Sequence, residues 1–240
     1  RVIPAIDRCK NAELVAIVRG SSAETDTFDL LDEYHNLDDL ILAKKVDAVY
    51  ISSPNIFHAE QAISCLKAGI HVLCEKPMAT TFEDCQAMLR VAKRKNLILQ
   101  VGHMLRFSAA LNTARFWLDE GRLGDTLEMN IIFHYNLPEK NRRWVKNKKL
   151  SGGGVLLDAG IHCIDVVRYF LGSNIIARSA KMNKCFEHGV PETRALLKYT
   201  CGDVVGSIDL NSASAYRSHL EISGKKACIS IENFAATWGT

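Results

Sequence analysis

Short apolar runs and helix-spaced apolar positions alternate along the first hundred residues of the chain. Residues 48–51 form an apolar run of β type that stops at the polar segment 52–55. Apolar side chains then recur at the spacing of one helix face through residues 59–66, and a second apolar run, 70–74, ends in the charged and rigid segment 75–77. The order strand, helix, strand predicts two parallel strands, and the carboxyl ends of parallel strands line the ligand crevice of an open sheet.

The same pattern continues on both sides of this unit. Residues 1–9 are typical of a helix, and residues 13–18 are typical of a buried strand. Thr80 and Glu83 match a capping box at the start of the next helix, and residues 97–101 form a further buried strand. Strands and helices are therefore predicted to alternate through this part of the chain.

The pattern changes in the second half of the chain. A helix over residues 108–120 precedes an alternating strand, 126–135, and a basic polar loop, 136–151, that carries Trp144. A strongly apolar helix follows over residues 155–171. Five further β-type runs are separated by turn residues: 175–177, 194–199, 204–210, 218–223 and 227–231.

The composition is that of an ordinary soluble globular protein, with 48% hydrophobic and 24% charged residues. A net charge of +3 is too small to indicate nucleic acid or an anionic membrane as a partner. No apolar stretch approaches the roughly 20 residues of a membrane span. The eight cysteines are scattered, without a C-x-x-C pair, which is typical of reduced thiols. We therefore expect a cytoplasmic protein.

Polar side chains are few in the apolar helix over residues 155–171. Asp158 and His162 are four residues apart and share one helical face, and Asp165 nearly shares it. Polar groups on a buried helix must be paired or face a cavity. The spacing leaves two interpretations open, a catalytic or metal-binding pair and a core histidine that is satisfied within the fold. A metal site would need further ligands, and Asp165 and His103 make a weak set, so we expect no metal.

Two separate motifs resemble the signature of the Gfo/Idh/MocA oxidoreductases. The first is Ser53-Pro54-Asn55 with His58 three residues on, followed by Glu75-Lys76-Pro77. The second is the glycine run 152–154, followed by Asp158 and His162. The resemblance runs across nearly the whole chain.

The resemblance implies two domains. Residues 1–104 would form a dinucleotide-binding domain with a Rossmann-type parallel sheet, and residues 105–240 an α+β domain with a mostly antiparallel open sheet for substrate binding and oligomer contacts. The G-x-G-x-x-G turn that should open a dinucleotide fold is absent. A protein that binds no dinucleotide would also lack this turn, but the helix-then-strand order of residues 1–18 is what should follow such a turn. We therefore expect the first βα unit, and likewise the C-terminal end, to be incomplete.

The resemblance also implies a catalytic trio of Lys76, Asp158 and His162, which would also bind the substrate. Trp144, in the basic loop, is a further candidate for contact with the substrate. His162 would move the proton of the substrate hydroxyl, Lys76 would stabilise the developing alkoxide, and Asp158 would orient His162 and the substrate hydroxyls. A cis Lys76–Pro77 bond is implied as well. Trp144 is either a lid over the crevice or an anchor for its own loop.

Residues expected to contact the cofactor lie at strand ends and at the crossing into the second domain: Arg19, Ser21, Ser22, Ser53, Pro54, Asn55, His58, Glu75, Lys76 and Arg106. For His58 two interpretations stay open, a contact with the cofactor and a surface histidine at the start of a helix. Arg19, Ser21 and Ser22 suit a 2′-phosphate, and no acidic residue stands at that strand end to hold a ribose hydroxyl. These residues favour NADP, while Glu24 and Asp26 keep NAD as the alternative.

The predicted function is hydride transfer between NAD(P) and a hydroxyl or carbonyl carbon of a sugar, polyol or related small molecule. We expect a homodimer or homotetramer formed through the second-domain sheet, with neither nucleic acid nor a membrane as a partner. The alternative is a non-catalytic relative that acts as a ligand sensor or scaffold. The presence of Lys76, Asp158 and His162 favours the enzyme.

Overall fold

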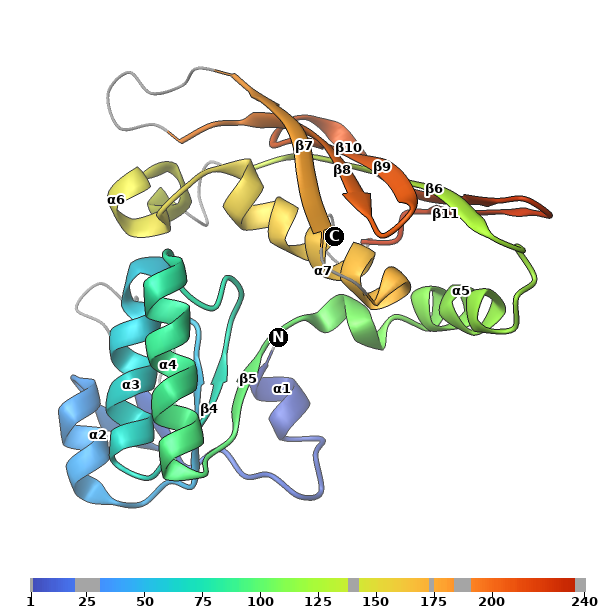
Figure 1. Cartoon of the computed structure of the whole chain (residues 1–240). Helices are drawn as coiled ribbons and strands as arrows, with labels where there is room; N and C mark the ends of the chain where they lie inside the picture. The colour runs from blue at the N-terminus through green and yellow to red at the C-terminus, as the bar shows by residue number, and fades with distance from the viewer. Residues whose placement is uncertain (1, 20–30, 138–142, 173–174, 184–190, 236–240) are drawn as a thin grey trace.

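The computed structural model describes residues 2–19, 31–137, 143–172, 175–183 and 191–235. Figure 1 shows two halves, each with its own layer of strands. Buried side chains form two clusters, one that contains Leu66 and Met88 and another that contains Phe133, Val166 and Leu210. Each half therefore has its own hydrophobic core.

The first half contains two parallel sheets. Strands β1 (Ala16–Val18) and β2 (Asp32–Tyr34) pair with each other, and β3 (Ala48–Ile51), β4 (His71–Cys74) and β5 (Leu99–Val101) form the second sheet. The Rossmann-type parallel arrangement predicted from the sequence is confirmed. The predicted strand at 48–51 agrees with β3 at both ends.

The α-helices described in this half are α1 (Ile3–Ile6), α2 (Leu37–Ala43), α3 (His58–Lys67) and α4 (Phe82–Lys95). In Figure 1, α2, α3 and α4 lie on one side of the strands and α1 lies on the other. The N-cap of α4 is Thr81, whose hydroxyl accepts a hydrogen bond from the backbone N–H of Asp84 at 3.1 Å. The predicted cap at Thr80 and Glu83 is therefore wrong by one residue. Thr80 instead packs against Gly152, where an added Cβ atom would lie 2.5 Å from its methyl group.

A six-stranded sheet in the order β11-β10-β6-β9-β8-β7 forms the second half. Its strands are β6 (Thr126–Asn136), β7 (Ile175–Met182), β8 (Arg194–Cys201), β9 (Val204–Asn211), β10 (Ala213–Gly224) and β11 (Cys228–Glu232). Neighbouring strands are antiparallel except β6 and β9, which are parallel. The mostly antiparallel sheet predicted from the sequence is confirmed.

The helices of the second half are α5 (Ala109–Asp119), α6 (Lys148–Ser151), the π-helical segment η4 (Leu156–Gly160) and α7 (Ile161–Leu171). Short 3₁₀ turns are η1 (Asn55–Phe57), η2 (Met104–Phe107) and η3 (Arg143–Lys146). The prediction of a loop through residue 151 is wrong for the part after residue 142, which forms η3 and α6. Asn147 starts α6, because its side chain accepts a hydrogen bond from the backbone N–H of Lys149 at 3.0 Å.

The helical run Lys148–Leu171 is long and apolar enough to span a membrane, contrary to the expectation from the sequence. However, 61% of its most apolar window is buried inside the protein. Side chains of α7, such as Val166 and Phe170, belong to the same core as the inner face of the six-stranded sheet. Packing against this sheet accounts for the apolar composition of the helix.

Candidate active site

Lys76 follows β4 and is buried where the two halves meet, with 8% of its surface exposed. Its ammonium nitrogen Nζ donates to the backbone carbonyl of Asp158 at 2.8 Å and to the carboxylate oxygen Oδ1 of Asp158 at 2.9 Å. The Lys76–Pro77 bond is cis, as the resemblance implied. Two of the three predicted catalytic residues are therefore in direct contact, although 82 positions separate them in the chain.

Tyr135 holds the other oxygen of the Asp158 carboxylate. Its hydroxyl donates to Oδ2 of Asp158 at 2.7 Å, and the tyrosine is 7% exposed. Sequence reasoning missed Tyr135. The alternation of β6 places it on the inward face, but an inward aromatic on a strand is more often a core residue, so the pattern carried no signal for a role at the site.

The start of the helix that carries Asp158 is fixed by close packing against Glu192. A Cβ atom added to Gly154 would lie 2.0 Å from the carbonyl oxygen of Glu192, so only glycine can occupy this position. The Glu192 carboxylate oxygen Oε1 accepts hydrogen bonds from the backbone N–H groups of Gly154 at 3.0 Å and Leu156 at 3.3 Å. These N–H groups would otherwise lack partners at a helix start. The glycine run thus presents Asp158 within the first turn.

His162 lies in α7, four residues after Asp158, and is 2% exposed. The two residues are not on one regular α-helix, because Asp158 lies in the π-helical segment η4. The predicted α-helical spacing of Asp158 and His162 is therefore wrong at this segment. π-helical turns are rare and often occur at functional sites.

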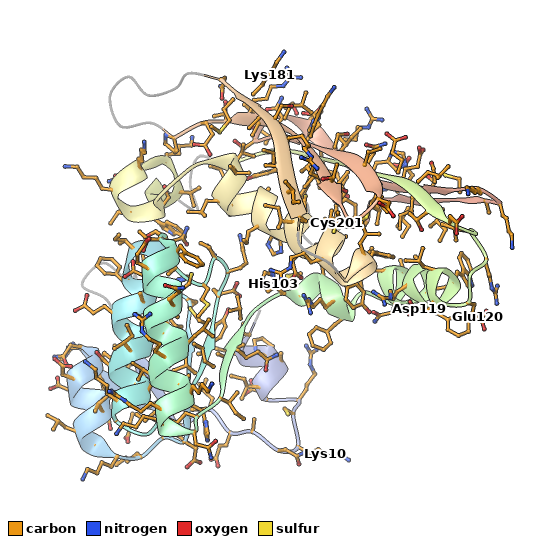
Figure 2. The ribbon with its side chains drawn as sticks, in the orientation of Figure 1. Lys10, His103, Asp119, Glu120, Lys181 and Cys201 are labelled. Atoms are coloured by element: carbon orange, nitrogen blue, oxygen red, sulfur yellow. The ribbon has the colours of Figure 1, made fainter. Side chains whose placement is uncertain are left out.

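Asp165 belongs to a second ion pair on the same helix. Arg106 donates to its carboxylate from Nε at 2.9 Å and from Nη2 at 2.6 Å. The Nδ1 atom of His103 lies 3.5 Å from Oδ2 of Asp165, and Figure 2 shows His103 at the junction of the two halves. The predicted cofactor contact of Arg106 stays a prediction. In the described part of the chain, no group of three or more His, Cys, Asp and Glu side chains could hold a metal ion.

Burial lowers the pKa of His103 below its ordinary value of 6.5, although the charge of Asp165 acts in the opposite direction. Below about pH 6.5 the unfolded chain therefore binds more protons at His103 than the folded chain does, so stability falls as the pH falls. We expect wild-type protein to lose more stability between about pH 8 and pH 5 than the His103→Gln variant. Urea denaturation at each pH measures this, and equal losses in both proteins would contradict it.

The turn after β3 contacts several other segments. The Ser53 hydroxyl donates to the side chain of Gln61 at 2.6 Å. Pro54 leads into η1, where Asn55 is buried and its side-chain amide donates to the carbonyl of Ser151 at 2.9 Å. This turn therefore binds the end of α6 in the second half.

Other predicted cofactor residues lie at the neighbouring strand ends. Glu75 accepts a hydrogen bond from the hydroxyl of Tyr50 at 2.5 Å. Arg19 follows β1, and its Nη2 donates to Glu33 on β2 at 2.7 Å, a partner that sequence reasoning missed. The remaining residues named for cofactor choice, Ser21, Ser22, Glu24 and Asp26, lie outside the described residues.

A cavity of about 450 Å³ opens beside Asp158. Its lining includes Tyr135, Glu192 and Lys146. Trp144, which was predicted to contact the substrate, is half-buried in η3. Among the described residues that line this cavity are its neighbours Val145 and Lys146, but not Trp144 itself. The role of Trp144 stays a prediction.

The fold and the site together define a Rossmann-type protein whose second, sheet-based half supplies a buried aspartate to a lysine at a strand end. The chain belongs to the Gfo/Idh/MocA family. Residues 1–103 match the family model described as oxidoreductase family, NAD-binding Rossmann fold, and residues 111–230 match the GFO/IDH/MocA C-terminal domain.

Three similar proteins illustrate this membership. The 1,5-anhydro-D-fructose reductase of Ensifer adhaerens is 34% identical over 193 residues, which are 76% of this chain and 57% of that protein. The crystal structure of aldose-aldose oxidoreductase from Caulobacter crescentus, complexed with glycerol, has a TM-score of 0.82 at 26% identity and covers 96% of this chain and 72% of that one. Levoglucosan dehydrogenase in complex with NADH and levoglucosan has a TM-score of 0.76 at 26% identity, with 84% of this chain and 58% of that one covered.

Proposed function

We propose that the protein transfers a hydride between a nicotinamide dinucleotide and a hydroxyl or carbonyl carbon of a sugar or polyol. The observation that carries this proposal is the buried contact between Lys76 and Asp158, which joins the strand ends of one half to the helix of the other. The names of the reductase and dehydrogenase relatives support a sugar-like substrate. They give no support to a non-catalytic sensor or scaffold.

The polar segments after β3, β4 and β5 fit a nicotinamide cofactor. The last residues of these strands, Ile51, Cys74 and Val101, are neighbours in register, so the polar segments that follow them lie side by side. Ser53 and Glu75 would hold the nicotinamide half. When bound, the cofactor accepts or donates the hydride.

The side chains around Asp158 can do the remaining chemistry. His162 would take the proton from the substrate hydroxyl or return it. The Lys76 ammonium would stabilise negative charge on the substrate oxygen, an effect that is strong in a site with little water. Asp158, held by Lys76 and Tyr135, would orient the substrate hydroxyls.

A panel of sugars and polyols, each tested with NAD and with NADP, tests the activity. We expect the absorbance of the reduced cofactor at about 340 nm to change with at least one substrate. Cofactor binding without any turnover across the panel would favour the ligand sensor, and binding of neither cofactor would favour the scaffold.

We propose that NADP is the preferred cofactor, because Arg19 stands at the strand end where a 2′-phosphate would lie. Replacement of Arg19 with alanine is expected to raise the KM for NADPH about 10- to 100-fold and to leave the KM for NADH unchanged, since a hydrogen bond to a charged group contributes about 1.5–3 kcal/mol. The Glu33→Gln variant is the control, because it removes the negative charge paired with Arg19 and keeps the arginine. Faster turnover of wild-type protein with NADH than with NADPH would contradict this preference.

Replacement of Tyr135 with phenylalanine is expected to lower kcat about 10-fold, because Asp158 loses the hydrogen bond that fixes one carboxylate oxygen. Tyr199→Phe is a matched control, since Tyr199 is also buried on the sheet and donates to the carbonyl of Met129 at 2.8 Å. Both variants should lose similar stability by urea denaturation, and only Tyr135→Phe should lose turnover. Similar kcat values in the two variants would contradict a role of Tyr135 at the site.

We propose that the protein is cytoplasmic and forms a homodimer or homotetramer. Cys65, Cys74 and Cys163 are buried free thiols, which supports a reducing compartment. Half-exposed apolar side chains on the sheet, such as Val205 and Ile176, support contact between copies. Light scattering after gel filtration would measure the assembly directly.

A further inference from the structure

His58 is one of the most deeply buried polar side chains in the described chain, with 1% of its surface exposed. It begins α3, immediately after η1. Its Nδ1 atom lies 2.8 Å from the carbonyl oxygen of Pro77, and its Nε2 atom lies 2.9 Å from the carbonyl oxygen of Ser53. The ring therefore spans the turn after β3 and the turn after β4.

Both carbonyl groups belong to turns that contain proline. Ser53 precedes Pro54, and Pro77 follows Lys76. Proline has no backbone N–H, so each turn has one donor fewer with which to satisfy its own carbonyl groups. A buried carbonyl needs a donor. A neutral imidazole carries one N–H, so it can donate to one of these two carbonyl groups while its other nitrogen packs against the second.

We propose that His58 is a positioning residue that fixes the turn containing Lys76 relative to the turn containing Ser53, and that it does not touch the cofactor. Both ring nitrogens face backbone carbonyl groups, so neither is directed at a ligand. His58 acts on the backbone next to Lys76, whereas Asp158 holds the ammonium at the far end of the same side chain. The effect on turnover rests on the proposed hydride transfer, and the effect on the two turns does not.

Two substitutions at His58 and one matched control test the proposal. His58→Leu removes both contacts, and His58→Gln keeps one donor. His71→Gln is the control, because His71 lies at the opposite end of β4 and its Nδ1 accepts a hydrogen bond from the backbone N–H of Ile98 at 3.0 Å.

Hydrogen–deuterium exchange of the full-length protein is the first measurement. We expect faster exchange in peptides over residues 50–58 and 72–80 in both His58 variants, with α4 unchanged and with no change in His71→Gln. Wild-type exchange rates in both turns would overturn the proposal, whether or not the wild-type protein transfers hydride. Lack of turnover by the wild-type protein would contradict the proposed function alone.

Kinetics on the active protein are the second measurement. His58→Leu is expected to lower kcat about 10- to 100-fold, the scale on which small misplacements of catalytic groups act, with a smaller loss in His58→Gln. The affinity for the cofactor, measured by fluorescence titration, should fall less than kcat, because the side chains of Ser53 and Glu75 are still present. A loss of cofactor affinity as large as the loss of kcat would overturn the proposal, because it would indicate a direct contact.

Discussion

Replacement of Lys76 with methionine is expected to lower kcat by about 10²- to 10³-fold and to destabilise the fold. Methionine keeps an unbranched apolar side chain but removes the ammonium that would face the developing alkoxide, and loss of one such preorganised group has an effect of about this size. The Asp158 carboxylate also stays buried without its cation, which costs about 3–5 kcal/mol of stability. Steady-state kinetics and urea denaturation measure the two effects separately.

The double variant Lys76→Met with Asp158→Asn distinguishes the effect of the ion pair on stability from the effect of Lys76 on turnover. It removes both members of the buried pair, so we expect much of the lost stability to return while turnover stays low. Lys225→Met is the control, because Lys225 pairs with Asp125 at 2.8 Å on the exposed surface, where such pairs contribute little. A folded Lys76→Met protein with wild-type turnover would remove Lys76 from the mechanism.

Replacement of His162 with glutamine is expected to lower kcat by about 10²- to 10⁴-fold, the usual contribution of a positioned proton-transfer group. Glutamine is polar and similar in reach, but it cannot carry the proton between the substrate hydroxyl and solvent. Cofactor affinity should change little, so the measurement is kcat together with a cofactor titration.

The control for His162 is the histidine on the outer face of β6. His134 lies 3.4 Å from Asp209 through its Nε2 atom, on the side of the sheet away from the apolar helix. His134→Gln should keep wild-type turnover. If His162→Gln kept it as well, His162 would belong to the core and not to the mechanism.

The carboxyl ends of β1, β3, β4 and β5, and the parallel or antiparallel nature of the sheets, could be predicted because the information is local. β3 agrees with its apolar run from Ala48 to Ile51, and the sheet of the second half is mostly antiparallel as expected. The errors are also local. Thr81 caps α4 in place of Thr80, because two adjacent threonines each have an acidic residue three positions on and only packing against Gly152 separates them.

The predicted site was harder to complete than the fold. Lys76, Asp158 and His162 carried recognisable motifs, whereas Tyr135, Glu33 and the π-helical segment η4 carried none. From the sequence, a tyrosine at an inward position of an alternating strand is predicted to be a core residue. The pattern is the same whether its hydroxyl donates to a carboxylate or to a backbone carbonyl. Tyr135 and Tyr199 are one example of each.

The sequence by itself determined most of the order of strands and helices and the polar residues at the strand ends, although the short strand β2 was not predicted. These follow from periodicity and from residue type, which act over a few neighbouring positions. The candidate lysine, aspartate and histidine came from the resemblance to the family. Only the tertiary structure decided that Lys76 meets Asp158, that Tyr135 holds the other carboxylate oxygen, and that His58 spans two turns. Periodicity reports which face of an element a side chain occupies, but the group that stands opposite is set by how distant segments pack together.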